Sequence, residues 1–338
     1  MKAKTLLEAT NYEGDWPKNL RSGDRKVFEK CRQYTVPEIR RYAIEGALVN
    51  QQSIVFKGHR QLIAFLPSND EGPTHLLNWK GKLGFLMKPR KNLSVGSYML
   101  VHSPFSHTYY HWLLESLPKL YLLRDYISEV TVLLPEHYNE DFHQQSLAIF
   151  SVSKTVSIQE KYNYHVKSLI GATQLKQAHH NPQLLKGFVE FLKERVSLDF
   201  KVADRIYVSR YQAKTRHVKN ESHLKPILNL HNIKVVYLED YSFDQQISIF
   251  HNSQLVIGAH GAGLANMIFM KKESSILELR PFDGGTNYFF YALANACSHH
   301  YYYQFGSSES AKKDFSADFR VDEGEFGDNI KKILTGAD

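Results

Sequence analysis

The second half of the sequence alternates between short apolar runs and amphipathic segments, and this alternation restricts the fold more than any other feature. Strands are predicted at 205–209, 234–238, 255–258 and 275–279, and helices at 222–230, 243–252, from Gly263 onward and at 287–296. A strand followed by a helix and another strand builds a parallel sheet with helices on its faces. This half therefore predicts a Rossmann-like α/β sheet.

The first half gives a second, less regular α/β pattern. Strand-like runs are predicted at 53–57, 82–88, 97–103, 129–135 and 155–159, and helices at 109–126, 140–150 and 181–198. Pro118 predicts a kink in the first of these helices. Because a domain averages about 150 residues, a chain of 338 residues predicts two α/β lobes, residues 1–185 and 186–338.

The charge of the chain limits its partners. A net charge of +7 and a pI near 9.1 suit a phosphate-bearing ligand, an anionic membrane surface or nucleic acid. Basic residues are scattered among acidic ones, and the sequence has no zinc finger, RNA-recognition signature or long basic block, which disfavours nucleic acid. We therefore expect anionic small-molecule ligands and peripheral contact with a membrane.

The cysteines and the apolar runs predict a compartment. Cys31 and Cys297 lie far apart, so neither a disulfide framework nor a zinc site is indicated, and a reducing compartment fits best. The first residues contain no apolar stretch long enough for a signal peptide, and no uncharged run of about 18 residues occurs. We expect a cytoplasmic protein that neither spans a membrane nor is exported by that route.

A glycine-rich turn, GAHGAG, connects the predicted strand at 255–258 to the following helix. Its glycines allow a tight turn, and the N–H groups at a helix N-terminus attract phosphate. The candidate donor-binding residues here are His260, Gly261, Ala262, Gly263 and Asn266. The same pattern also occurs where a strand–helix connection needs glycine only for packing.

Glu278 ends the next predicted strand, 20 residues after Gly258, where nucleotide-binding sheets often place an acid on ribose hydroxyls. It favours a nucleoside diphosphate over bare phosphate, although an ion pair with Arg280 is an alternative. An NAD(P)-dependent oxidoreductase is the direct competitor. Against it, the glycine order is G-x-x-G-x-G and not G-x-G-x-x-G.

Polar residues flank the predicted strand at 205–209. Arg205 precedes it, and Ser209 and Arg210 stand at its carboxyl end, the side where such sheets bind ligands. Arginine matches diphosphate oxygens bidentately and can neutralise a leaving group without a metal ion. Arg216, farther along, fits a solvated basic loop better.

His111 and Glu115 stand four residues apart in the predicted helix at 109–126 and therefore share a face. A carboxylate, or an imidazole held by one, can take the proton from an attacking hydroxyl. A surface pair or a buried structural histidine gives the same spacing. His102 and His107 lie nearby without a metal-ligand spacing, and no D-x-D triplet occurs, so metal-independent chemistry is preferred.

Several blocks occur in an order that resembles glycosyltransferase family 61. They are HWLLESLPKLYLL, RIYVSR with the downstream Asn-Glu, FDQQISIFHNSQLVIGAHGAGLANMIFM and ILELRP, within about residues 100–300. The resemblance implies a GT-B architecture with two Rossmann-like lobes and inverting, metal-independent transfer from a nucleotide sugar, with UDP the expected nucleotide. Residues 1–185 would then form the acceptor side, and residues 186–338 would bind the donor.

The resemblance also assigns site residues. His111 and Glu115 correspond to the reacting face, either being the base, and the donor-site positions are Arg210, His260, Gly261, Gly263, Asn266 and Glu278. Eukaryotic members often have His followed by Asp in this helix and a membrane anchor, and neither is present here. This difference implies a bacterial-type enzyme of capsule, lipopolysaccharide or similar polysaccharide biosynthesis, with a glycan or lipid-linked acceptor at the inner face of the membrane. A non-catalytic glycan- or nucleotide-binding module is the other alternative.

Overall fold

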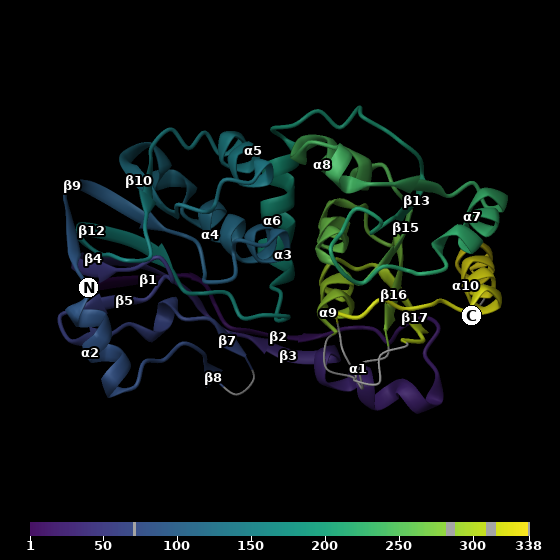
Figure 1. The fold of residues 1–338 in the computed structure, drawn as a ribbon, viewed down its shortest axis with the longest axis horizontal. Coiled ribbons are helices and arrows are strands. Elements are labelled where there is room, and N and C mark those ends of the chain that lie inside the picture. Colours follow the sequence, from purple (N-terminus) through teal and green to yellow (C-terminus); the bar gives the residue numbers. More distant parts are fainter. Residues whose placement is uncertain (70–71, 282–287, 309–315, 337–338) are drawn as a thin grey trace. The chain divides into compact units, whose positions relative to one another are not determined.

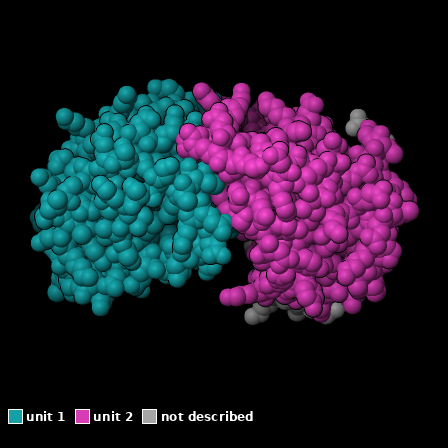
Figure 2. All heavy atoms as spheres, turned by 90° about the horizontal axis from the view of Figure 1, so that it is seen from above, with its two compact units in different colours: residues 1–10, 35–179 teal, residues 11–34, 180–338 magenta. Residues whose placement is uncertain are grey.

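The computed structural model describes residues 1–69, 72–281, 288–308 and 316–336 (Figure 1). The chain forms two compact units, coloured separately in Figure 2. Unit 1 comprises Met1–Thr10 and Thr35–His179, and unit 2 comprises Asn11–Tyr34 and His180–Asp338. Each is built from helices and strands, as the α/β class predicts. The predicted boundary after residue 185 falls inside α6 (Pro182–Lys193), and a domain division at that point stays a prediction.

Unit 1 is built on an eight-stranded mixed sheet of order β11-β10-β9-β12-β4-β5-β6, with β1 beside β4. The strands β9 to β12 run parallel, whereas β4 is antiparallel to its three neighbours. Their bounds are β1 (Lys2–Leu7), β4 (Ile39–Val49), β5 (Val55–Lys57), β6 (Arg60–Gln61), β9 (Arg90–Leu100), β10 (Val130–Pro135), β11 (Thr155–Ile158) and β12 (Asn163–Ala172). The sequence pattern does not predict β4 and β12, the pair that joins the two halves of this sheet.

The predicted strand at 82–88 is wrong, because this segment lies in the helix α2 (Trp79–Met87). The side chain of Asn78 accepts a hydrogen bond from the backbone N–H of Gly81 and so caps the helix N-terminus. Phe85 packs inward against Phe56, leaving other apolar residues of α2 exposed. An apolar run this short does not by itself distinguish a strand from a helix.

The predicted helix at 109–126 is present but irregular. It consists of α3 (Tyr109–His111), a π-helical turn η3 (Trp112–Ser116), α4 (Leu117–Leu122) and a 3-10 segment η4 (Arg124–Glu129). Pro118, in the first turn of α4, has no N–H to donate, and the N–H of Leu117 instead donates to Trp112, five residues back. The helix α5 (Asp141–Ile149) follows β10.

Unit 2 contains the parallel sheet that the sequence predicts, with strand order β14-β13-β15-β16-β17. The strands are β13 (Arg205–Val208), β14 (Lys234–Val236), β15 (Leu255–Ala259), β16 (Ser275–Pro281) and β17 (His300–Gly306). This order is the 2-1-3-4-5 arrangement of doubly wound folds, and the chain reverses direction across the sheet between β13 and β15. A ligand is therefore expected at the carboxyl ends of these two strands.

In unit 2, α7 (Glu221–Leu230), α8 (Phe243–His251) and α9 (Phe289–Ala296) connect consecutive strands. The helix α6 precedes β13, and α10 (Glu323–Thr335) follows β17. The helix that the sequence predicts from Gly263 onward is a 3-10 helix, η6 (Ala262–Phe269). Asn287, in the predicted helix 287–296, lies outside the described residues. Across the described ranges, every helix is too short or too polar to cross a membrane.

Residues 11–34 belong with unit 2, although they come near the start of the chain. The strands β2 (Thr10–Glu13) and β3 (Gln33–Val36) pair with each other and flank α1 (Arg25–Arg32). Phe28 of α1 is fully buried, with its ring centroid 5.0 Å from that of Tyr291 and 4.7 Å from that of Tyr303. The N-terminal segment therefore completes the core beside α9 and β17.

We expect Phe28→Ala to destabilise unit 2 by about 3–5 kcal/mol, because the truncated side chain leaves a cavity among aromatic rings. Hydrogen-exchange mass spectrometry should show faster exchange in α9 and β17, since it reports the opening of each segment separately. Lys26→Ala, at an exposed position of the same helix, serves as the control. Unchanged protection of α9 and β17 in Phe28→Ala would contradict this account.

Candidate functional site

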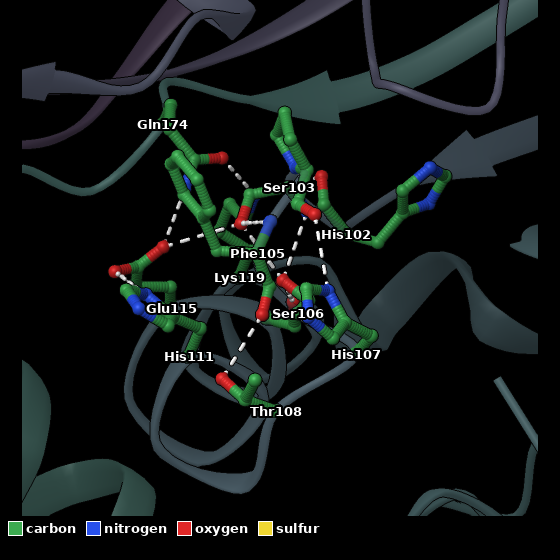
Figure 3. A network of polar contacts seen from close by, with 12 residues as sticks. His102, Ser103, Phe105, Ser106, His107, Thr108, His111, Glu115, Lys119 and Gln174 are labelled. Carbon is green, nitrogen blue, oxygen red and sulfur yellow. Dashed lines mark hydrogen bonds and ion pairs between the residues drawn. The ribbon is translucent and has the colours of Figure 1, made fainter. Parts of the chain in front are cut away.

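In unit 1, the predicted pair of His111 and Glu115 forms a short hydrogen bond (Figure 3). The distance from His111 Nδ1 to Glu115 Oε1 is 2.6 Å, and the two side chains are 18% and 4% exposed. The rings of Phe105 and Tyr110 lie 5.3 and 5.2 Å from the imidazole, centroid to centroid. The imidazole is thus held in place on a buried carboxylate and keeps one accessible side.

The second oxygen of the Glu115 carboxylate is also occupied. Oε2 accepts hydrogen bonds from Gln174 Nε2 at 3.1 Å and from Ser103 Oγ at 3.3 Å. A buried carboxylate that lacked such donors would gain a proton or destabilise the fold. These contacts therefore supply the hydrogen bonds that a buried carboxylate needs.

Lys119 fixes the orientation of Gln174. Its buried Nζ donates to Gln174 Oε1, which turns the amide NH₂ group toward Glu115 (Figure 3). Burial lowers the pKa of Lys119 to about 7, although the nearby Glu115 carboxylate opposes this shift. The sequence analysis missed both residues, since Gln174 lies 59 positions from its partner and nothing in its neighbourhood marks it.

These contacts give the two members of the pair different roles. Because both oxygens of Glu115 accept hydrogen bonds, His111 must carry its proton on Nδ1 when the imidazole is neutral. Its Nε2 is then a lone-pair acceptor, and it forms no hydrogen bond within the described part of the chain. The arrangement can accept a proton at Nε2 and stabilise the resulting imidazolium through Glu115.

A loop anchored by serines supports this pair. Ser106 Oγ lies 2.9 Å from Ser103 Oγ and accepts a hydrogen bond from Ser116 at 2.7 Å, and Tyr138 donates to the Ser103 carbonyl at 2.8 Å. Burial lowers the pKa of His102 to about 3, and both of its ring nitrogens face backbone carbonyls. His102 is therefore structural, and the described residues contain no group of three or more His, Cys, Asp or Glu placed to hold a metal ion.

In unit 2, the glycine turn and Arg210 meet at the carboxyl ends of β13 and β15. A Cβ atom on Gly261 would lie 2.0 Å from Arg210 Nη1, so the guanidinium passes directly against this glycine. The guanidinium also donates from Nη2 to the Thr215 carbonyl at 2.9 Å. Glycine is needed at 261 for space and not for its backbone angle, since its φ of 179° is extended.

His260 and Glu278 form a buried pair beside this turn. His260 Nδ1 hydrogen-bonds Glu278 Oε1, and the hydroxyl of Tyr301 donates to Oε2. Burial lowers the pKa of His260 despite the attraction of Glu278. Burial would raise the pKa of Glu278, but His260 and Arg280 outweigh it and hold that pKa below its ordinary value. The carboxylate orients the imidazole, and its ribose contact stays a prediction.

Cationic side chains surround this pair. Burial and then Arg210 lower the pKa of Arg216 to about 10, while Glu278 opposes the shift. Burial also lowers the pKa of Arg210. The guanidinium of Arg280 is fully buried and lies 4.7 Å above the ring of Tyr288. Partly desolvated like charges at one sheet edge favour binding of an anion. Arg216, which the sequence analysis placed in a solvated loop, belongs to this group.

Other predicted donor-site residues contact protein groups. Ser209 Oγ lies 2.8 Å from Glu221 Oε1, and Asn266 Nδ2 donates to Gln246 Oε1 at 2.9 Å. A Cβ atom on Gly263 would meet Leu238 Cδ1 at 2.7 Å, so this glycine is required for packing. Ala262 begins η6 directly after Gly261. Ser209, Ala262 and Gly263 lie just beyond the carboxyl ends of β13 and β15, whereas Asn266 is buried farther along η6.

Arg205 is not brought to this edge. It begins β13, at the amino end of the strand, and its Nη1 donates to the His231 carbonyl at 3.1 Å. Since β13 runs parallel to β15 and its far end pairs with Gly258, Arg205 and Arg210 lie at opposite ends of one strand. Because Arg205 lies away from the edge where a donor is expected, its position argues against a role of this residue in donor binding.

Two comparisons relate the sequence of this chain to known proteins. The sequence profile of the family described as "Glycosyltransferase 61" matches residues 109–277, half of the chain. The matched range includes His111, Glu115, Arg210 and His260. A Drosophila melanogaster protein named "EGF domain-specific O-linked N-acetylglucosamine transferase" is 32% identical over 114 residues, which cover 32% of this chain and 22% of that protein. The similarity thus spans about a fifth of the relative.

The folded-state pKa of Lys119 leads to a pH-dependent stability. Because about 7 lies below the ordinary value of 10.5, the unfolded chain binds more protons than the folded chain between these pH values. This group should make the free energy of unfolding rise with pH across that window. Urea unfolding of Lys119→Met should show a shallower rise than the wild type. Lys4→Met, at an exposed position of β1, should follow the wild-type curve, and identical slopes for all three proteins would refute the pKa assignment.

Proposed function

The chain belongs to glycosyltransferase family 61 and is a glycosyltransferase, and from this premise we propose how it acts. It transfers a sugar from a nucleotide-sugar donor to a hydroxyl of a glycan or lipid-linked acceptor. The transfer inverts the anomeric configuration and requires no metal ion. A GT-B architecture is part of this proposal, supported by the Rossmann-like sheet of unit 2.

The single observation that carries the mechanism is the short His111–Glu115 hydrogen bond with Glu115 fully engaged. Of the two candidates for the base, this favours His111. Its Nε2 takes the proton of the acceptor hydroxyl while that oxygen attacks the anomeric carbon, and the bond from this carbon to the donor diphosphate breaks. The negative charge of Glu115 stabilises the imidazolium that forms, as an orienting carboxylate does in other histidine-dependent sites.

The donor diphosphate binds at the carboxyl edge of the unit 2 sheet in this proposal. Arg210 and Arg216 supply positive charge there, and the missing side chain of Gly261 leaves room for the Arg210 guanidinium at this edge. The departing nucleoside diphosphate gains negative charge as the glycosidic bond breaks, and fixed cations stabilise that charge. The Glu278 carboxylate holds His260 through Nδ1 and so fixes the orientation of its ring beside the proposed diphosphate position.

For the substrates we propose a class of donor and one sugar to test first. A UDP-linked donor remains the expected one, and N-acetylglucosamine is the first sugar to test because the Drosophila relative is named for its transfer. The bacterial-type assignment, capsule or lipopolysaccharide biosynthesis and a cytoplasmic site at the inner face of the membrane stay predictions. Family membership favours glycosyl transfer over an NAD(P)-dependent oxidoreductase, and the complete His111–Glu115 pair argues against a non-catalytic binding module.

Removing the base should lower turnover strongly. We expect His111→Ala to reduce kcat by about 10²–10⁴-fold, the usual contribution of general base catalysis. Glu115→Gln should also lower kcat, but less, because the imidazolium that forms during transfer loses its counter-charge. Nucleoside diphosphate release from a panel of nucleotide sugars, with mass spectrometry of the products, measures both.

His107→Ala provides the matched control for the base. His107 lies on the loop just before α3 and is exposed, and its side chain hydrogen-bonds only the Pro104 carbonyl among the described residues. Its removal should therefore leave kcat near the wild-type value. Near-normal transfer by His111→Ala would show that the base is misassigned. Stabilisation of the wild type by NAD but by no nucleotide sugar in a thermal-shift screen would overturn the proposed reaction itself.

UDP binding should depend on Arg210, at the carboxyl end of β13, and not on Arg205, at its amino end. Arg210→Lys keeps the charge but loses the planar, bidentate guanidinium, so the Kd for UDP should rise by about tenfold or more. Arg205→Lys, the same change at the opposite end of the strand, should leave this Kd unchanged. Isothermal titration calorimetry with UDP compares them, and equal effects of the two substitutions would remove Arg210 from the donor site.

A further inference from the structure

The helix α2 of unit 1 exposes an apolar stripe. Trp79, Leu83 and Met87 are 70%, 51% and 74% exposed, and Leu76 just before the helix is 54% exposed. Residues four positions apart lie on one helix face, so these side chains form a continuous strip along α2. Isolated exposed apolar residues are ordinary, but a strip that includes a tryptophan indicates a binding surface.

The opposite face of α2 fixes the helix to the body of unit 1. Phe85 is buried and stacks on Phe56 of β5, with ring centroids 4.5 Å apart, and Leu77 and Leu86 pack against the same cluster. Figure 1 shows α2 next to β5. Because this packing already orders the helix, the exposed strip is presented in a fixed conformation, and a ligand need not order the helix on binding.

Basic residues flank the strip. Helical geometry places Lys80 on one side of it and Lys82 on the other, and Lys88, Arg90 and Lys91 follow directly. Residues 72–114 contain no Asp or Glu. None of these five side chains forms an ion pair with an acidic side chain in the part of the chain that the structure describes. This local charge beside an apolar strip suits a partner that is both anionic and apolar.

We propose that α2 is an interfacial membrane-binding helix that inserts Trp79, Leu83 and Met87 into an anionic leaflet while Lys80 and Lys82 contact lipid phosphates. An apolar strip with lysines at its edges is the pattern of helices that lie in the plane of a bilayer surface. Each lysine near an anionic leaflet adds attraction, and the acyl region receives the apolar side chains. The tryptophan ring suits the boundary between headgroups and acyl chains.

A second copy of the chain fits this surface less well. A two-fold symmetric contact through the strip would bring the lysines of each copy near those of the other, and like charges disfavour such a contact. The membrane proposal does not depend on the proposed transfer reaction. Vesicle binding is measured without donor or acceptor, so failure of one proposal leaves the other standing.

Co-sedimentation of the full chain with vesicles tests the proposal. The chain should bind phosphatidylcholine vesicles that contain about 25% phosphatidylglycerol, bind pure phosphatidylcholine much more weakly, and dissociate as the salt concentration rises. Trp79→Ser/Leu83→Ser/Met87→Ser should weaken binding by about a hundredfold or more. Lys80→Gln/Lys82→Gln should weaken binding to the anionic vesicles by about tenfold or more.

Matched substitutions in unit 2 test whether the loss of any exposed leucine or pair of lysines would weaken vesicle binding. Leu230→Ser removes a leucine that is 75% exposed at the end of α7, and Lys225→Gln/Lys234→Gln removes two exposed lysines. Both variants should bind vesicles like the wild type. The circular dichroism of every variant should match the wild type, which shows that the fold is retained.

Three outcomes would overturn the proposal. The first is a wild-type chain that fails to bind anionic vesicles at low salt. The second is a triple serine variant that binds them as tightly as the wild type. The third is a wild-type dimer in light scattering that the triple variant dissociates, which would identify a second copy as the occupant. A blue shift of tryptophan emission that is present with Trp79 and absent in Trp79→Phe would support insertion, since Trp112 is fully buried and Trp16 is half-buried beneath Arg25 and Arg32.

Discussion

A buried carboxylate is the constraint around which the candidate reacting site of unit 1 is organised. Glu115 is held away from water, and an ion in that position must be compensated by donors on several sides. Those donors come from three separate segments: the helix itself through His111, the loop after β9 through Ser103, and the chain after β12 through Gln174. The polar network thus ties together segments that lie far apart along the chain.

The sequence predicts secondary structure best where the local hydrophobic pattern of a segment matches the burial of that segment in the fold. The strands of unit 2 are buried between helices, so they appear as short apolar runs, and four of the five were predicted close to their observed bounds. The order of those strands also explains why Arg210 and the glycine turn meet, since parallel neighbours end at the same edge. Glu278, by contrast, was assigned to a ribose from spacing alone, and its observed partners are His260 and Tyr301.

Other features depend on contacts between distant residues and could not be predicted. The segment at 82–88 fits a strand or a helix, and only its packing on Phe56 and the cap at Asn78 decide for the helix. Lys119 looks like one more polar residue of an amphipathic helix, yet it is buried against Gln174. Gly261 and Gly263 look equivalent in the sequence, but one gives room to a guanidinium and the other to a leucine.

Pro118 has an effect that extends beyond its own position. The π-helical turn before it contains one residue more than an α-helical turn, which rotates the upstream segment by about 100° relative to α4. His111 lies on that upstream segment, whereas Lys119 lies in α4. The π-helical turn therefore sets the angle between the His111 and Lys119 side chains around the helix axis. An inserted or deleted residue anywhere between the two would change that angle, so chain length in this helix is as restricted as the identity of its polar side chains.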